Sequence, residues 1–134
     1  MLEFTPDLET NVTSVDDQHK EIIKLINDLS EMGAKSFTLE ELTKTLDFLG
    51  DYAIRHFHDE EELMRKWKYP RYEEHKEMHK KFISIFDELK AELLRKGPSV
   101  EFVFQVNKSI VNWIMLHIKQ ADKAMAAYIA NDNL

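Results

Sequence analysis

The sequence predicts an all-α protein: an up-down-up-down antiparallel four-helix bundle with an extended N-terminal arm. Only three of the 134 residues are glycine and three are proline, and so few helix-breaking residues favour helices over strands. Apolar residues recur at alternating spacings of three and four, the pattern of a helix with one buried face. Three short breaks divide this pattern into four segments. Because short connections make neighbouring helices antiparallel, four such helices form a bundle.

The breaks give expected helix boundaries near 15–33, 39–67, 71–96 and 100–131. Gly33 ends the first helix, and Thr38 with Glu41 forms a capping box that begins the second. Pro70 separates the second helix from the third. A Gly-Pro pair separates the third helix from the fourth, which Ser99 is expected to cap. Residues 1–134 are therefore expected to form a single domain, with the segment before the first helix packed along the bundle.

The composition excludes several classes of protein. A net charge of −7 argues against binding to nucleic acid or anionic lipid, because like charges repel. The lack of cysteine excludes disulfides and thiolate metal sites. The N-terminus does not have the pattern of a signal peptide, and no apolar run is long enough to span a bilayer. A cytoplasmic protein without membrane insertion is therefore expected.

Each predicted helix has one stripe of residues that is expected to face the interior. The four stripes, in chain order, are Val15, His19, Ile22, Ile26, Leu29; Leu42, Leu46, Leu49, Ala53, His56, Glu60, Leu63, Trp67; Tyr72, His75, His79, Phe82, Phe86, Leu89, Leu93; and Val103, Val106, Ile110, Trp113, His117, Ala121, Ala124, Tyr128. His56 and Glu60 thus point inward. His58 and Glu62 lie about 200° away on the outer face, where a histidine is a solvated surface residue.

Five of the six histidines lie on these inward stripes: His19, His56, His75, His79 and His117. Chance would place five of six there roughly once in a hundred cases. All five are expected at one end of the bundle, where odd-numbered helices begin and even-numbered helices end. Clustered imidazoles in an apolar core are costly unless paired, and a metal ion pairs each through one nitrogen. The alternative is a metal-free bundle whose buried histidines bond to backbone carbonyls.

The donor set predicts two metal ions. Five imidazoles exceed what one ion holds in a protein, whereas two ions bridged by carboxylates use them all. Imidazole and carboxylate without thiolate suit iron, ahead of manganese or zinc. Glu60 lies inward at the right depth to be a bridge. Asp122 has two interpretations: a rim residue paired with Lys119 or Lys123, or a second bridge turned inward by a π-bulge after His117.

Four segments of the sequence carry the candidate ligands: DDQHKEIIKLIN, with the first histidine; HFHDEEELM, with His-Phe-x-x-Glu-Glu; YPRYEEHKEMHKKF, with His-x-x-x-His; and WIMLHIKQAD, with His-x-x-x-x-Asp. Together these segments resemble the hemerythrin family, specifically its stand-alone bacterial branch. Each pattern alone is weak, but the four occur in order and together cover nearly the whole chain. Phe4 stands where relatives often have tryptophan, and it lies outside the ligand set.

The resemblance implies a non-heme diiron centre. It implies that one iron ion is held by His75, His79 and His117, and the second by His19 and His56. Glu60 and Asp122 would bridge the two ions, together with an oxo or hydroxo group. In this family the two-histidine iron keeps an open position, where oxygen binds and from which it leaves again. The expected function is reversible oxygen binding for transport, storage or delivery, so the protein is not expected to be an enzyme.

Only two of the seven protein ligands are anionic, and low ligand charge stabilises high-valent iron less, which favours oxygen release over cleavage of its bond. Trp113 and Ile114 are expected to line the oxygen pocket. The alternatives are a diiron enzyme or a sensor acting on oxygen, peroxide or nitric oxide, and an iron reservoir. The expected partners are O2, or NO, and an oxygen-consuming client enzyme. We expect a monomer.

Overall fold

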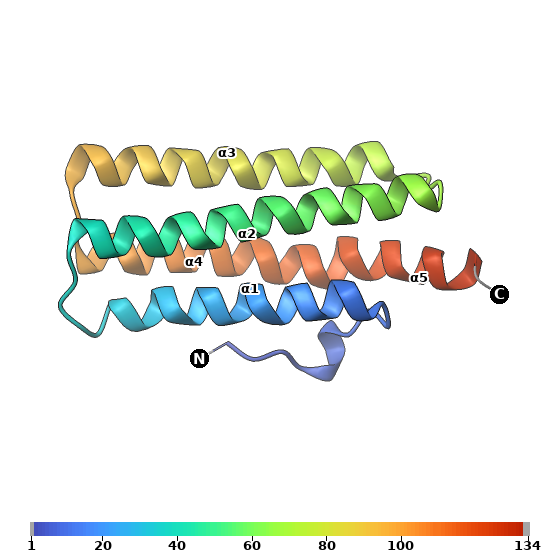
Figure 1. Ribbon diagram of the computed structural model, residues 1–134, viewed down its shortest axis with the longest axis horizontal. Helices are drawn as coiled ribbons and strands as arrows, with labels where there is room; N and C mark the ends of the chain where they lie inside the picture. The colour runs from blue at the N-terminus through green and yellow to red at the C-terminus, as the bar shows by residue number, and fades with distance from the viewer. Residues whose placement is uncertain (1, 133–134) are drawn as a thin grey trace.

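The structure, a computed structural model, describes residues 2–132 as a bundle of antiparallel helices (Figure 1). Its elements are η1 (Pro6–Leu8), a 3-10 helix; α1 (Thr13–Met32); α2 (Leu39–Lys66); α3 (Tyr72–Lys96); α4 (Val100–His117); η2 (Ile118–Asp122), a π-helix; and α5 (Lys123–Asp132). The helices α4, η2 and α5 follow one another without a break and form the fourth rod of the bundle (Figure 1). The predicted all-α up-down-up-down four-helix bundle is confirmed.

Capping side chains begin two of the helices as the sequence predicts. The Oγ1 atom of Thr38 accepts a hydrogen bond from the N–H of Glu41 at 3.1 Å, and the Glu41 carboxylate accepts one from the N–H of Thr38 at 3.3 Å. At α4 the Ser99 Oγ accepts from the N–H of Phe102 at 3.0 Å. Each cap satisfies N–H groups that the first turn leaves unpaired. None of the helices in the described part is long and apolar enough to cross a membrane.

The segment before α1 packs along the bundle, as predicted, but it is not extended throughout. The turn η1 buries Leu8 completely, and Leu2 and Phe4 pack against the main core. Asn27 holds the start of this arm: its Oδ1 accepts from the N–H of Leu2 at 3.0 Å, and its Nδ2 donates to the Leu2 carbonyl at 2.8 Å. Pro6 begins the turn because its fixed φ suits the first position of a helix.

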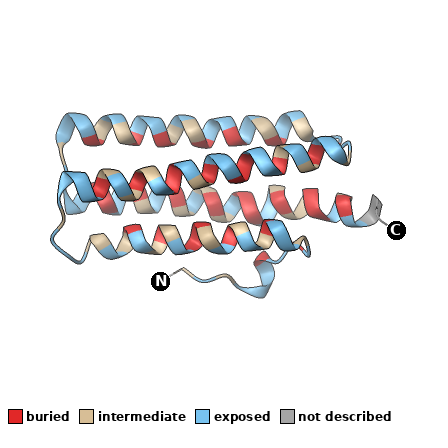
Figure 2. Ribbon diagram, viewed as in Figure 1, coloured by how far each residue is buried: buried red, intermediate tan, exposed pale blue. Residues whose placement is uncertain are grey.

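The buried residues follow the inner faces of the helices (Figure 2). Beyond His117, however, the predicted stripe is wrong by one residue: Asp122, Met125 and Ile129 are buried, together with Ile118 and Ala126, whereas Ala121, Ala124 and Tyr128 are only partly buried. The π-helix η2 causes the shift, since a π-turn holds one residue more than an α-turn. Near the end of α2, Met64 is buried instead of Leu63, because the stripe steps by four residues from Glu60.

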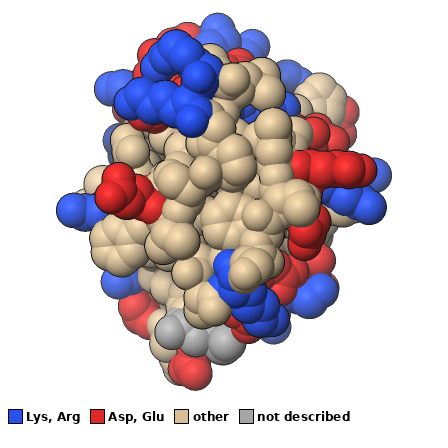
Figure 3. Space-filling model, turned by 90° about the vertical axis from the view of Figure 1, so that its left-hand side faces the viewer, with Lys and Arg blue, Asp and Glu red and all other residues tan. Residues whose placement is uncertain are grey.

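The end of the bundle where α2 and α4 begin carries none of the predicted ligands. Figure 3 shows this end: uncharged side chains occupy its centre, and charged side chains of both signs surround them. Leu39 and Val100, the first residues of α2 and α4, are among the exposed apolar residues there. The candidate site therefore lies toward the opposite end, where α1 and α3 begin.

Candidate metal centre

Seven side chains from all four rods of the bundle meet in the interior at that opposite end. They are His19 from α1, His56 and Glu60 from α2, His75 and His79 from α3, His117 from α4 and Asp122 from η2. Each is at most 6% exposed. By contrast, His58 is a surface residue, 68% exposed, next to Glu62. The structure thus brings together all seven residues that the sequence predicts as candidate ligands. His58, which the sequence places on the surface, lies outside this group.

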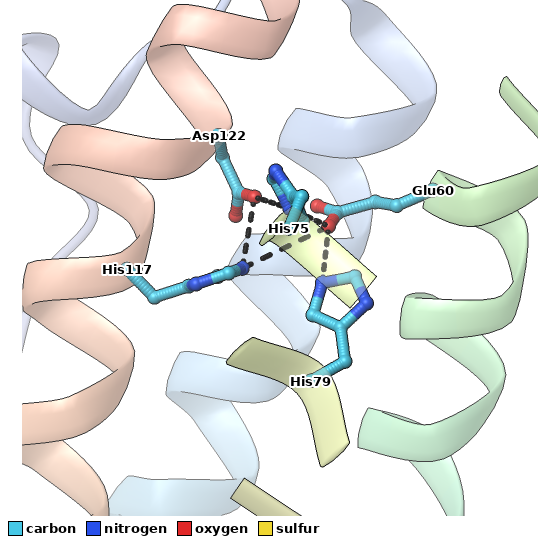
Figure 4. Close-up of side chains that lie close together, drawn as sticks. All are labelled: Glu60, His75, His79, His117 and Asp122. Carbon is cyan, nitrogen blue, oxygen red and sulfur yellow. Dashed lines mark hydrogen bonds and ion pairs between the residues drawn. The ribbon is translucent and has the colours of Figure 1, made fainter. Parts of the chain in front are cut away.

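The donor atoms form two groups that share their carboxylates. One group contains Glu60, His75, His79, His117 and Asp122, and Figure 4 shows how their side chains point toward one another. The other contains His19, His56, Glu60 and Asp122. Within each group the donor atoms lie within 4.8 Å of one another. Each group could hold a metal ion, and Glu60 and Asp122 are common to both groups.

Several of the closest contacts have the distance of a hydrogen bond but not its geometry. His19 Nε2 lies 2.8 Å from Asp122 Oδ2, and His117 Nε2 lies 3.1 Å from Asp122 Oδ1. Yet these nitrogens and both oxygens of Asp122 have no hydrogen-bond partner, although all are buried. Buried polar atoms are normally paired. These unpaired donor atoms belong to the two groups that lie within 4.8 Å of one another, so they could hold a metal ion.

The π-helix decides between the two interpretations of Asp122. In a regular α-helix a spacing of five residues turns a side chain by about 140°, which would direct Asp122 away from His117. The wider turn of η2 brings both side chains to the same face. Asp122 is fully buried, so the hypothesis of a π-bulge is confirmed and the alternative of a rim aspartate paired with Lys119 or Lys123 is wrong.

Two further residues at the site do not follow from the spacing of residues in the sequence. Gln18 Oε1 lies 2.6 Å from His56 Nδ1, and a Glu61 carboxylate oxygen lies 2.9 Å from His79 Nδ1. Glu61 lies outside the predicted inward stripes, yet its side chain is only 15% exposed because it reaches around α2 to the ring of His79. Glu61 is thus a third carboxylate near the centre, in addition to those of Glu60 and Asp122. The second glutamate of the His-Phe-x-x-Glu-Glu pattern was the available signal.

Aromatic rings form the walls around two of the histidines. Phe57 stacks on His79 with ring centroids 4.1 Å apart, and Trp113 stacks on His117 at 4.5 Å. Trp113 also lines a cavity of about 320 Å³ beside His75 and His117. Ile114 is buried in the main core. Stacked rings hold the imidazoles in fixed orientations and exclude water from their faces.

The charges of the centre depend strongly on one another. Burial lowers the pKa of the His19 imidazole, but Asp122 and Glu60 outweigh burial and raise that pKa to about 9. In the same way the two carboxylates raise the pKa of His117 to about 10. Burial opposes ionisation of the Glu60 and Asp122 carboxyl groups, yet the surrounding imidazoles hold their pKa values well below the usual range. The two carboxylates therefore favour the protonated form of the His19 and His117 imidazoles.

The stability of the metal-free chain should consequently fall as the pH rises. His19 and His117 have higher pKa values in the folded chain than the usual value of 6.5. Their contribution to stability is complete below pH 6.5 and is lost as the pH rises through about 9 and 10. We expect the Tm of metal-free protein to decrease by several degrees between pH 7 and pH 10, since a domain of this size loses about 4 °C per kcal/mol.

Differential scanning calorimetry across this pH range would measure the effect. Protein loaded with zinc is the control, because zinc is redox-inert and replaces the protons between imidazoles and carboxylates. Its Tm should stay constant or rise over the same range. A flat profile for the metal-free chain would mean that the buried imidazoles are neutral at pH 7.

Comparison with known proteins agrees with this geometry. Residues 10–129 match the family model of the hemerythrin HHE cation-binding domain. The chain is 32% identical to a bacteriohemerythrin of Methylococcus capsulatus over 114 residues, 85% of either chain. It is 34% identical to a myohemerythrin of Theromyzon tessulatum over 108 residues, 81% of this chain and 77% of that one. A crystal structure of wild-type hemerythrin superimposes with a TM-score of 0.84 at 30% identity, covering 95% of both chains. The chain belongs to the hemerythrin family.

Proposed function

We propose that this protein binds O2 reversibly at a non-heme diiron centre, for transport, storage or delivery of oxygen. The observation that supports this most directly is the meeting of five imidazoles and two shared carboxylates in two overlapping groups of donors. Imidazole with carboxylate is a donor set that suits iron. The bacteriohemerythrin and the myohemerythrin that the chain resembles bear names from the same family.

The two metal positions in this proposal are unequal. One iron ion would be held by His75, His79 and His117, and the other by His19 and His56. Glu60 and Asp122 would bridge the two ions, together with an oxo or hydroxo group. Because the second position has one imidazole fewer, it retains room for a small ligand. Two ferrous ions supply, when bound, the two electrons that oxygen accepts on binding and returns on leaving.

The surrounding residues favour release of oxygen over its consumption. The donor set contains two carboxylates among seven side chains, which leaves the centre with little negative charge to stabilise highly oxidised iron. Phe57 and Trp113 cover the rings of His79 and His117 and keep out the water and protons that promote irreversible oxidation. We therefore infer a binding protein rather than an enzyme. In this proposal it acts as a cytoplasmic monomer and supplies O2 to a client enzyme.

The test is an oxygen cycle on protein that has been loaded anaerobically with ferrous iron. Visible absorption is recorded after O2 is admitted and again after it is removed under vacuum. A band that appears and disappears over repeated cycles is the expected result. One-way oxidation in the first cycle would instead favour a diiron enzyme. A response to nitric oxide alone, with none to O2, would favour a sensor of nitric oxide.

A further inference from the structure

Two of the candidate ligands, His56 and His79, each contact a second side chain on the side of the ring that faces away from the centre. Neither of these second side chains is itself a candidate ligand. The Nε2 atoms of His56 and His79 face Glu60, at 2.8 Å and 3.0 Å. Their Nδ1 atoms face away from the centre, toward Gln18 at 2.6 Å and Glu61 at 2.9 Å respectively. Both histidines are 1% exposed. Each ring is therefore fixed between the centre and one specific partner.

The amide of Gln18 can present only its oxygen to His56. Its Nε2 donates to Asp59 Oδ2 at 2.8 Å, and a carboxylate only accepts hydrogen bonds. The Gln18 oxygen is thus left for His56, whose Nδ1 must donate the hydrogen. This places the hydrogen of the neutral imidazole on Nδ1 and directs the lone pair of Nε2 toward the metal position.

Glu61 imposes the same tautomer on His79, but with a charged group. Its carboxylate can only accept, so Nδ1 of His79 donates and Nε2 keeps its lone pair. The Glu61 side chain is 15% exposed, and Phe57 covers the face of the imidazole. In such partly desolvated surroundings the negative charge acts more strongly on the ring than it would in water.

We infer that Gln18 and Glu61 are positioning residues of the centre, and that their different charges make the position of His79 the stronger of the two. The inference rests on the proposed function, since it concerns histidines that would hold iron. A carboxylate behind an imidazole makes that ring a better electron donor than a neutral amide does. His19, the other imidazole of the two-histidine position, has no hydrogen-bond partner at Nδ1 in the described structure. The weaker position is therefore the one with room for a ligand that must leave again.

The first experiment removes the charge behind His79 and keeps the shape. Glu61→Gln retains an oxygen that accepts from Nδ1, whereas Glu61→Leu removes the hydrogen bond altogether. Glu62→Gln is the matched control, because Glu62 is the next residue of α2 and is 63% exposed. Anaerobic competition between the protein and a chelator for cobalt(II) measures the two affinities. We expect Glu61→Gln to weaken the tighter ion about 10-fold, and Glu61→Leu about 100-fold, while Glu62→Gln changes neither.

The second experiment moves a charge to the other position without altering the net charge. In the double variant Gln18→Glu with Asp59→Asn, the new carboxylate at position 18 accepts from His56, and the new amide at position 59 can donate to that carboxylate. We expect the weaker cobalt(II) ion to bind about 10-fold more tightly. On iron-loaded protein the two changes should shift the reduction potential in opposite directions, upward for Glu61→Gln and downward for the double variant. A role limited to packing would not produce shifts of opposite sign.

Circular dichroism would confirm that each variant remains helical. If wild-type protein binds two cobalt(II) ions and both Glu61 variants bind them with unchanged affinity, the inference is wrong and the proposed function stands. Potentials that shift in the same direction would also overturn it. If the wild-type protein itself binds no cobalt(II), the proposed function fails together with the inference.

Discussion

Replacing Glu60 with glutamine is expected to remove at least one of the two proposed metal ions. The affinity for the other ion should fall more than about 100-fold, which exceeds the usual effect of changing a residue that only hydrogen-bonds to a ligand. The two oxygens of Glu60 lie between 2.8 and 3.9 Å from Nε2 atoms of all five buried histidines. No other side chain of the centre contacts all five. A glutamine amide is neutral and has a single oxygen, so it cannot bridge two cations.

Metal content after anaerobic loading with ferrous iron would measure this effect, with the concentration of free iron held constant. Glu77→Gln is a suitable control, since Glu77 lies on α3, is 70% exposed and makes the same change in net charge. Retention of two ions per chain by Glu60→Gln would show that Glu60 does not bridge them.

Inserting one alanine after Gln120 is expected to destroy the centre and to destabilise the fold. One extra residue turns everything that follows by about 100°, which would carry Asp122, Met125 and Ile129 out of the interior. Burial of the two apolar side chains contributes about 1.5–3 kcal/mol each. The free energy of unfolding should therefore fall by roughly 3–6 kcal/mol, and the shared Asp122 ligand would be lost.

Deleting Gln120 is the matched comparison. The deletion shortens the spacing from His117 to Asp122 from five residues to four, and a regular α-helix places residues at that spacing on one face. Gln120 is itself exposed, so the shortened helix should keep both the buried stripe and the metal content. Chemical denaturation and metal analysis of both variants would measure these effects. If the insertion variant bound as much metal as the wild-type protein, the extra residue in the turn of η2 would not be what positions Asp122.

The sequence predicts the fold well because its signals are local. The Thr38–Glu41 capping box and the Ser99 cap depend on residues three positions apart, and the 3-and-4 spacing of apolar residues persists through most of each helix. Five of the seven candidate ligands are histidines on inward stripes, where their number alone indicates a metal centre. Glu60 lies on the same inward stripe as His56, so its position also follows from the periodicity of the sequence.

The remaining features depend on contacts that periodicity does not describe. Asp122 is out of phase with His117 in an α-helix, and only the π-turn of η2 brings the two together. For the same reason the buried stripe of α5 is shifted by one residue from the predicted one. Gln18 and Glu61 are long side chains that begin outside the inward stripes and reach around their helices to His56 and His79. Residue spacing predicts the direction of the Cα–Cβ bond, but it does not predict the position of the terminal atoms of a long, flexible side chain.

The number of ferrous ions that the chain binds in the absence of air tests the central claim most directly. Anaerobic equilibrium dialysis of purified protein against excess ferrous salt should give two ions per chain. The same measurement on protein in which His56 and His79 are both replaced with alanine should give a clear loss, because each position then lacks an imidazole. Fewer than two ions for the wild-type chain, or two ions still held after both replacements, would contradict the account.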